Sequence, residues 1–85
     1  MPEEEIGVIS HYYGNIQVAG IHVERGTLKV GDRIHVVGHT SDFEQTVDSM
    51  QVEHDTVEEA GPGDDVGVKV VDHAREHDKV FKVTD

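Results

Sequence analysis

The fold of this chain is decided by the stretch VERGTLKVGDRI, residues 23–34. Gly26 and Gly31 mark two chain reversals, because glycine adopts the positive φ angles of tight turns without steric cost. The two reversals leave room between them for only a very short strand. We expect Leu28 and Val30 on that strand to point inward, because residues two apart on a strand share a face.

Aspartates complete this turn chemistry. Asp32 is placed to accept hydrogen bonds from nearby backbone N–H groups of its own turn. Gly63 and Asp64 repeat the glycine–aspartate pair just before a run of alternating valines. The sequence therefore predicts strands that are connected by short, well-defined turns.

The chain as a whole has a β composition. It holds fifteen valines and five isoleucines against a single leucine, and branched side chains favour strands over helices. Apolar residues recur with a period of two between glycines, at Ile6 and Val8, Ile16 and Val18, Ile34 and Val36, Val66, Val68 and Val70, and Val80. This pattern predicts an all-β fold of six or seven antiparallel strands. We expect a small closed Greek-key barrel, because closure removes exposed sheet edges.

Length and charge exclude several classes of protein. The chain has 85 residues, no cysteine and a formal net charge of −11, so disulfide scaffolds and non-specific nucleic-acid binding are not expected. No apolar run is long enough to span a membrane, and the acidic N-terminus lacks the basic start of a signal peptide. We expect a cytoplasmic protein with a disordered tail at residues 1–4 and a single domain at residues 5–83.

Three blocks of the sequence resemble the second domain of translational GTPases such as elongation factor Tu and initiation factor 2, namely residues 18–34, 47–51 and 60–68. Residues 38–43 and 49–54 also resemble small stand-alone proteins described as translation elongation factor-like. A similar module is attached to U32 family peptidases. The resemblance covers Ile6 to Val83 and implies the translation factor domain II barrel.

In the translational GTPases this barrel helps to hold the aminoacylated 3′ end of tRNA, so the resemblance implies a tRNA acceptor end or a translation-related protein as partner. Counting back from the Gly63-Asp64 turn, the glutamate of that pocket falls on Gln51 and the arginine of the next turn falls on Gly61. Gln51 keeps an amide that can bond a base or ribose, whereas Gly61 supplies no cation. The chain lacks a phosphate-binding Gly-x-x-x-x-Gly-Lys-Ser/Thr loop, so we expect no GTP hydrolysis.

No catalytic constellation stands out in the sequence, and we expect neither an enzyme nor a cofactor. There is no Gly-x-Ser-x-Gly nucleophile elbow, and the paired carboxylates flank turns where they are solvated. We also expect no metal site. The histidines that would form one, if residues 72–78 made a helical turn, are His73 and His77, because spacing of four residues places both rings on one side of a helix.

We therefore interpret the chain as a non-catalytic binding module. Adjacent aromatics at Tyr12 and Tyr13 point to opposite faces of a strand, so one of them is free for contact. The candidate contact residues are Tyr13, Asn15, His39, Thr40, Phe43 and Gln51. Two alternatives remain open at this point: an acidic accessory module that docks onto a basic partner enzyme, and a small barrel that binds a metal or small ligand through its histidines.

Overall fold

The computed structural model describes residues 3–53 and 55–84. This part of the chain forms ten strands: β1 (Glu3–Tyr13), β2 (Val18–Val23), β3 (Leu28–Lys29), β4 (Arg33–Val37), β5 (Asp42–Thr46), β6 (Met50–Val52), β7 (Asp55–Val57), β8 (Glu59–Ala60), β9 (Asp65–Lys69) and β10 (Lys79–Val83). Across these residues we find no helix of the length and hydrophobicity that a membrane crossing requires. The all-β prediction is confirmed, with more and shorter strands than the six or seven expected.

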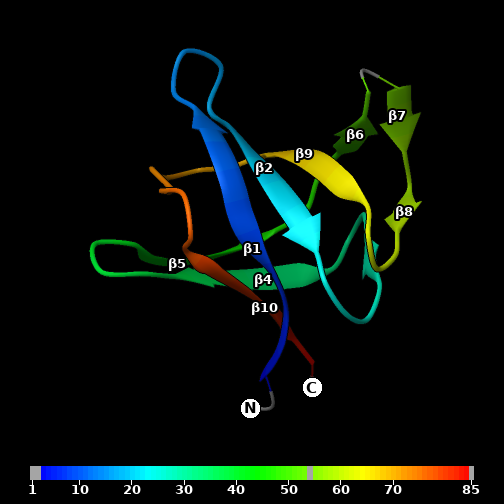
Figure 1. The fold of residues 1–85 in the computed structure, drawn as a ribbon, viewed down its shortest axis with the longest axis horizontal. Helices are drawn as coiled ribbons and strands as arrows, with labels where there is room; N and C mark the ends of the chain where they lie inside the picture. Colours follow the sequence, from blue (N-terminus) through cyan, green and yellow to red (C-terminus); the bar gives the residue numbers. More distant parts are fainter. Residues whose placement is uncertain (1–2, 54, 85) are drawn as a thin grey trace.

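Eight of the strands form one antiparallel sheet, in the order β5-β4-β10-β1-β2-β9-β6-β7, and β3 pairs with β8 separately. The sheet is strongly coiled, so that β2 runs across the direction of β4, while β10 and β1 pair with each other between them (Figure 1). One hydrophobic core fills the space inside the coil. Its members, all nearly inaccessible, are Ile6, Ile9, Ala19, Ile21, Val23, Leu28, Ile34, Val36, Val47, Met50, Ala60, Val66, Val68, Val70, Ala74 and Val80.

Two β-bulges in β1 produce much of this bend. The register of β1 shifts against β10 between Glu5 and Gly7, and against β2 between Ile9 and His11. A bulge adds one residue to one strand and increases its local twist. The extra residue also changes which side chains face the core, so Ile6 and Ile9 are buried. The simple alternation read from Ile6 and Val8 therefore does not continue along this strand.

The side chain of Gln45 links the two halves of the coiled sheet. Gln45 lies on β5, is 8% exposed, and donates from Nε2 to the carbonyl of Lys69 at 2.8 Å. Its Oε1 accepts from the backbone N–H of Val71, also at 2.8 Å. One primary amide thus replaces a pair of backbone bonds between β5 and the end of β9.

This side-chain link corrects the prediction of a closed barrel. Among the described residues the backbone ladder does not close, because β5 and β7 stand at opposite ends of the eight-stranded sheet. Across the described residues, the hydrogen bonds between β5 and the chain at the end of β9 are made by the Gln45 side chain. Sequence periodicity reveals strands and the faces of their side chains. It does not reveal whether two strands are joined by backbone hydrogen bonds or by a side-chain amide such as that of Gln45.

Turns of the predicted type recur at three places. The Oδ2 of Asp32 accepts from the N–H of Lys29 at 2.9 Å, and the Oδ2 of Asp64 accepts from the N–H of Gly61 at 2.9 Å. Asp78 makes the same contact with Arg75 at 2.9 Å. The residue before each aspartate has positive φ, namely Gly31, Gly63 and His77. The capping role predicted for Asp32 and Asp64 is confirmed.

One local prediction is wrong. Val30 is 40% exposed rather than inward, because β3 ends at Lys29 and Val30 already belongs to the following turn. Residues 72–78 do not make the helical turn on which a metal site at His73 and His77 would depend; instead His77 adopts a φ of 74° in the Arg75–Asp78 turn. Glycine is the usual residue there, so a helix breaker was not visible in the sequence.

The N-terminal boundary also differs from the sequence-based expectation. Met1 and Pro2 lie outside the described residues, but Glu3 and Glu4 belong to β1 and pair with Val83 and Lys82 of β10. The predicted tail at residues 1–4 is thus not supported for its last two members. Pairing with the final strand gives their backbone groups the hydrogen-bond partners that the sequence alone does not reveal.

We predict that Gln45→Leu lowers the free energy of unfolding by about 2 kcal/mol, because it leaves the partly buried C=O of Lys69 and N–H of Val71 without this partner. Urea unfolding followed by circular dichroism measures the change. Gln51→Leu is the matched control, because the same chemical change at an exposed site should alter stability by less than about 0.5 kcal/mol. Equal effects of the two substitutions would show that the Gln45 amide does not join the sheet.

Candidate functional site

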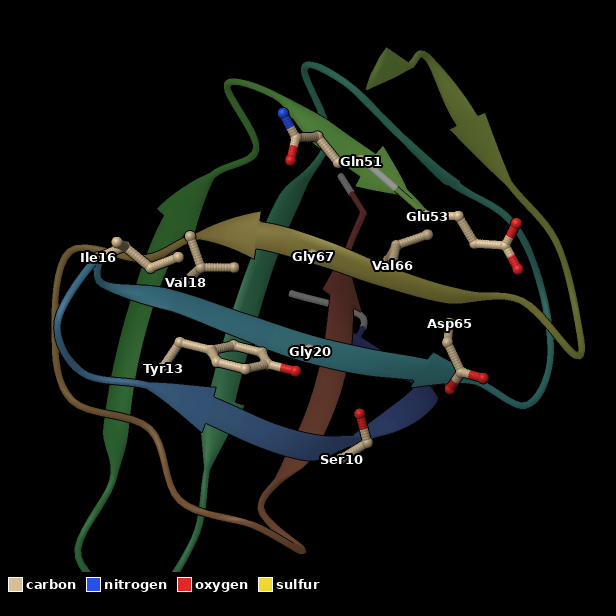
Figure 2. Close-up of a pocket in the computed structure, with 10 residues that line it drawn as sticks. All are labelled: Ser10, Tyr13, Ile16, Val18, Gly20, Gln51, Glu53, Asp65, Val66 and Gly67. Carbon is tan, nitrogen blue, oxygen red and sulfur yellow. The ribbon is translucent and has the colours of Figure 1, made fainter. Parts of the chain in front are cut away.

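A hollow of about 360 Å³ lies on the outer face of β1, β2, β9 and β6. We name it the glycine hollow and show its lining in Figure 2. The lining residues are Ser10, Tyr13, Ile16, Val18, Gly20, Gln51, Glu53, Asp65, Val66 and Gly67. The hollow brings together Tyr13 and Gln51, two of the predicted contact residues from distant parts of the sequence.

Two glycines form the middle of this surface. Gly20 of β2 stands opposite Gly67 of β9, and Gly67 stands opposite Gln51 of β6. A Cβ at Gly20 would lie 3.0 Å from the Oγ of Ser10, and a Cβ at Gly67 would lie 3.3 Å from a methyl group of Val18. Side chains of neighbouring residues therefore approach the backbone closely at both glycines. The absence of two side chains in register is what makes the sheet surface concave here.

An aromatic and apolar rim borders the glycines on one side. Tyr13 is 50% exposed and Ile16 is 62% exposed, and both lie with Val18 on the same side of Gly20 and Gly67 (Figure 2). The ring of His11 meets the Tyr13 ring edge-on, with centroids 4.4 Å apart. His11 in turn donates from Nδ1 to Glu76 at 3.0 Å. The Tyr13 ring is therefore held in place by a chain of contacts while its outer face stays free.

The opposite side of the hollow is acidic. Glu53 and Asp65 lie there together in Figure 2. Asp65 accepts a hydrogen bond from the Nδ1 of His22 at 2.8 Å, yet its side chain is still 69% exposed. No lysine, arginine or histidine belongs to the lining within the part of the chain that the structure describes. The local potential is consequently negative, which opposes phosphate binding.

The structure separates the other predicted contact residues from the hollow. Asn15 is exposed in the turn between β1 and β2 but does not line the hollow. His39 and Thr40 are exposed in the loop between β4 and β5. Phe43 packs partly buried against the core. The six candidates therefore do not form one surface.

The loop between β4 and β5 lies instead against residues 72–78. The hydroxyl of Ser41 donates to the carbonyl of His73 at 3.5 Å. A Cβ built on Gly38 would overlap the carboxylate of Asp78. A glycine is needed at this position for the two loops to pack closely. Loop packing therefore explains Gly38, and the residue does not indicate a ligand site.

The two histidines considered for a metal site, His73 and His77, have different structural roles. The His73 ring packs on Tyr12, with centroids 4.4 Å apart and an interplanar angle of 55°. His77 occupies the positive-φ position of its turn. Residues 3–53 and 55–84 contain no group of three or more metal-ligating side chains placed to hold an ion. The helical geometry on which the metal alternative depended is absent from this segment.

Sequence reasoning found Tyr13 and Gln51 but missed most of the hollow. Ile16 and Val18 were interpreted as a strand pair, although Ile16 lies in the turn before β2. Gly20 and Gly67 carried a usable signal, since an isolated glycine within a strand pattern marks a close backbone approach. Their pairing was not visible, because β2 and β9 are far apart in the chain.

A second, larger hollow of about 530 Å³ lies beside β3 and β8 and is lined by Lys29, Val30, Glu58 and Glu59. The ammonium group of Lys29 is 3.5 Å from Glu59. Opposite charges at this place already compensate one another in part, and none of the predicted contact residues lies there. The glycine hollow is therefore the better candidate, despite its smaller volume.

Outside the hollow, His35 forms a cluster with two carboxylates. Its Nε2 lies 2.6 Å from Asp42 and its Nδ1 lies 3.0 Å from Glu3, while the ring is 19% exposed. Ionised carboxylates only accept hydrogen bonds, so both ring nitrogens donate when the ring is protonated. The hydrogen bond to Asp42 is the largest cause that raises the pKa of His35, and Glu3 adds to it against the opposing effect of burial.

Comparisons with known proteins agree with this fold. The sequence model of the family named elongation factor Tu domain 2 matches residues 17–83. The chain therefore belongs to the elongation factor Tu domain 2 family. The C-terminal domain of a U32 peptidase from Geobacillus thermoleovorans superposes with a TM-score of 0.88 over 95% of this chain and 93% of that domain. At 19% sequence identity this match describes the fold alone.

Curated relatives carry protease names. An uncharacterized protease of Methanocaldococcus jannaschii is 41% identical over 78 residues, which cover 91% of this chain and 19% of the relative. A collagenase of Porphyromonas gingivalis is 32% identical over 72 residues, which cover 84% of this chain and 20% of the relative. The chain thus spans about one fifth of the length of these relatives. The predicted resemblance to domain II and to the U32 peptidase module is confirmed.

We predict that the contribution of His35 to stability falls as the pH rises. Its folded pKa is raised above 6.5, so the stabilisation is fully present below the unfolded pKa of about 6.5 and is lost as the pH rises through the folded pKa. Urea unfolding of the wild type and His35→Gln should differ by up to about 1 kcal/mol at pH 5.5 and by less at pH 8.5. His39→Gln, in an exposed loop, serves as control, and a pH-independent difference for His35→Gln would contradict the assignment.

Proposed function

We propose that this chain is a non-catalytic binding module that holds part of another protein in the glycine hollow. The observation that carries the proposal is the composition of the hollow: an exposed aromatic and apolar rim faces an acidic rim across two glycines. Protein interfaces combine aromatic anchors with a polar border in this way. The acidic surface of the chain, with a net charge of −11, favours a basic partner.

The lining residues also support a role without catalysis. Ser10 is the only hydroxyl-bearing aliphatic residue among them, and no histidine of the described lining is available to activate it. Nucleophilic catalysis by serine requires a base within hydrogen-bond reach. We therefore infer that the module serves an enzyme as an accessory part rather than cleaving a substrate itself. The protease names of the relatives support an enzyme partner, and the cytoplasmic location expected from the sequence is part of the proposal.

A second candidate function is recognition of an RNA acceptor end. It is favoured by one specific observation, the presence of Tyr13 and Gln51 in the same hollow. A ring face can stack on a base while an amide bonds the base edge or ribose. Membership in the elongation factor Tu domain 2 family gives this translation-related reading its support. The acidic rim opposes it, because Glu53 and Asp65 would lie near the backbone phosphates.

We predict that a photo-reactive p-benzoylphenylalanine placed at position 13 crosslinks to protein in cells that produce the chain. The side chain at this position borders the hollow and is half exposed, so it should touch whatever the hollow holds. The same group at exposed Val71, which does not line the hollow, is the control. Adducts that resist ribonuclease and depend on position 13 support the proposal, whereas equal adducts from both positions contradict it.

For the RNA alternative, the test is an amide NMR titration with an aminoacylated minihelix that ends in CCA, at low salt and again at higher salt. Recognition of the acceptor end predicts saturable shifts at Tyr13, Gly20 and Gln51 that weaken as salt increases. Absence of these shifts at low salt, where electrostatic attraction is least screened, removes RNA as the occupant and leaves the protein-binding function.

A further inference from the structure

The register of four strands gives the glycine hollow a direction. His11 of β1, Gly20 of β2, Gly67 of β9 and Gln51 of β6 are successive cross-strand partners. They form one row that runs perpendicular to the strands. Three strand-to-strand spacings of roughly 4.8 Å make this row about 14 Å long. An extended peptide covers the same length with about four residues.

The rows on either side of the glycines differ in chemistry. On one side Val18 stands opposite Tyr13, which gives an apolar and aromatic wall. On the other side His22 stands opposite Asp65, and its ring is already hydrogen-bonded to that carboxylate. Glu53 joins Asp65 on this acidic side (Figure 2). A trough with one apolar wall and one anionic wall therefore crosses the sheet.

Such a trough matches an extended segment in which basic and apolar residues alternate, because neighbouring side chains of an extended chain point in opposite directions. The apolar side chains can lie against Val18 and the Tyr13 ring. The charged heads of lysine or arginine can pair with the carboxylates of Asp65 and Glu53 on the other wall. Lys69 stands opposite Val18 in register and does not line the hollow.

We propose that the glycine hollow binds a short basic segment of a protein partner, laid across β1, β2, β9 and β6 with lysine or arginine side chains directed at Asp65 and Glu53. This inference rests on the proposed function and specifies that the segment bound in the hollow is basic. A second copy of this chain is a poor occupant, because a net charge of −11 makes the copies repel one another. A nucleic acid lacks the cations that the acidic wall requires.

The test uses the labelled chain and three blocked hexapeptides: Gly-Lys-Leu-Lys-Leu-Gly and the same peptide with glutamine or glutamate in place of both lysines. Amide NMR titration should show saturable shifts at Gly20 and Gly67 with the lysine peptide and none with the glutamate peptide. The double substitution Glu53→Gln and Asp65→Asn should weaken binding of the lysine peptide about tenfold. Higher salt should weaken it as well.

The matched control is the double substitution Glu58→Gln and Glu59→Gln, which removes the same net charge at the other hollow and should leave the affinity within about twofold. Equal weakening by both double variants would overturn the inference, because only overall charge would then matter. Equal binding of the glutamine peptide at Gly20 and Gly67 would also overturn it, while leaving the hollow as a protein-binding site. If no peptide shifts these glycines, the inference fails, and crosslinking at position 13 decides the proposed function separately.

Discussion

The amide of Gln45 is the constraint on which the arrangement of the sheet depends. It joins β5 to Lys69 at the end of β9 and to Val71 just beyond that strand, through two hydrogen bonds of 2.8 Å, where a closed barrel would use a backbone ladder. The inner faces of β4 and β9 then enclose a common core of branched aliphatic residues. Because strand side chains alternate between faces, burying Val66 and Val68 fixes Gly67 on the outside. The floor of the glycine hollow is thus a consequence of how the core is packed.

Bulges and turns position the walls of that hollow. The bulge between Ile9 and His11 adds a residue to β1 at the point where Ser10 meets the glycine row. The turn after β1 carries Ile16 to the rim, where it is 62% exposed. Aspartate-capped turns with positive φ at Gly31, Gly63 and His77 hold the remaining loops close to the sheet. Local backbone chemistry thereby positions side chains that come from distant parts of the sequence.

Some carboxylates of the surface lie beside a histidine or lysine, and some line the glycine hollow. His11, His22 and His35 each lie within hydrogen-bond distance of at least one carboxylate, and Lys29 lies beside Glu59. The hollow combines carboxylates with an exposed aromatic ring and no lining cation among the described residues. An excess of negative charge on a solvated surface has a small effect on the stability of the fold. Carboxylates gathered beside an apolar wall, in contrast, give a binding surface a preference for a basic partner.

The sequence by itself determined the class of fold, its strands and its tight turns, because branched residues, period-two alternation and glycine–aspartate pairs act over a few residues. It also predicted Tyr13 and Gln51 as candidate contact residues, one from strand geometry and the other from family resemblance. Only the tertiary structure decided that they share a hollow with Gly20 and Gly67, that Phe43 packs against the core, and that Gln45 replaces a barrel ladder. Each of these depends on the pairing of distant strands, and the register of such pairs is set by packing of the whole core rather than by any local segment.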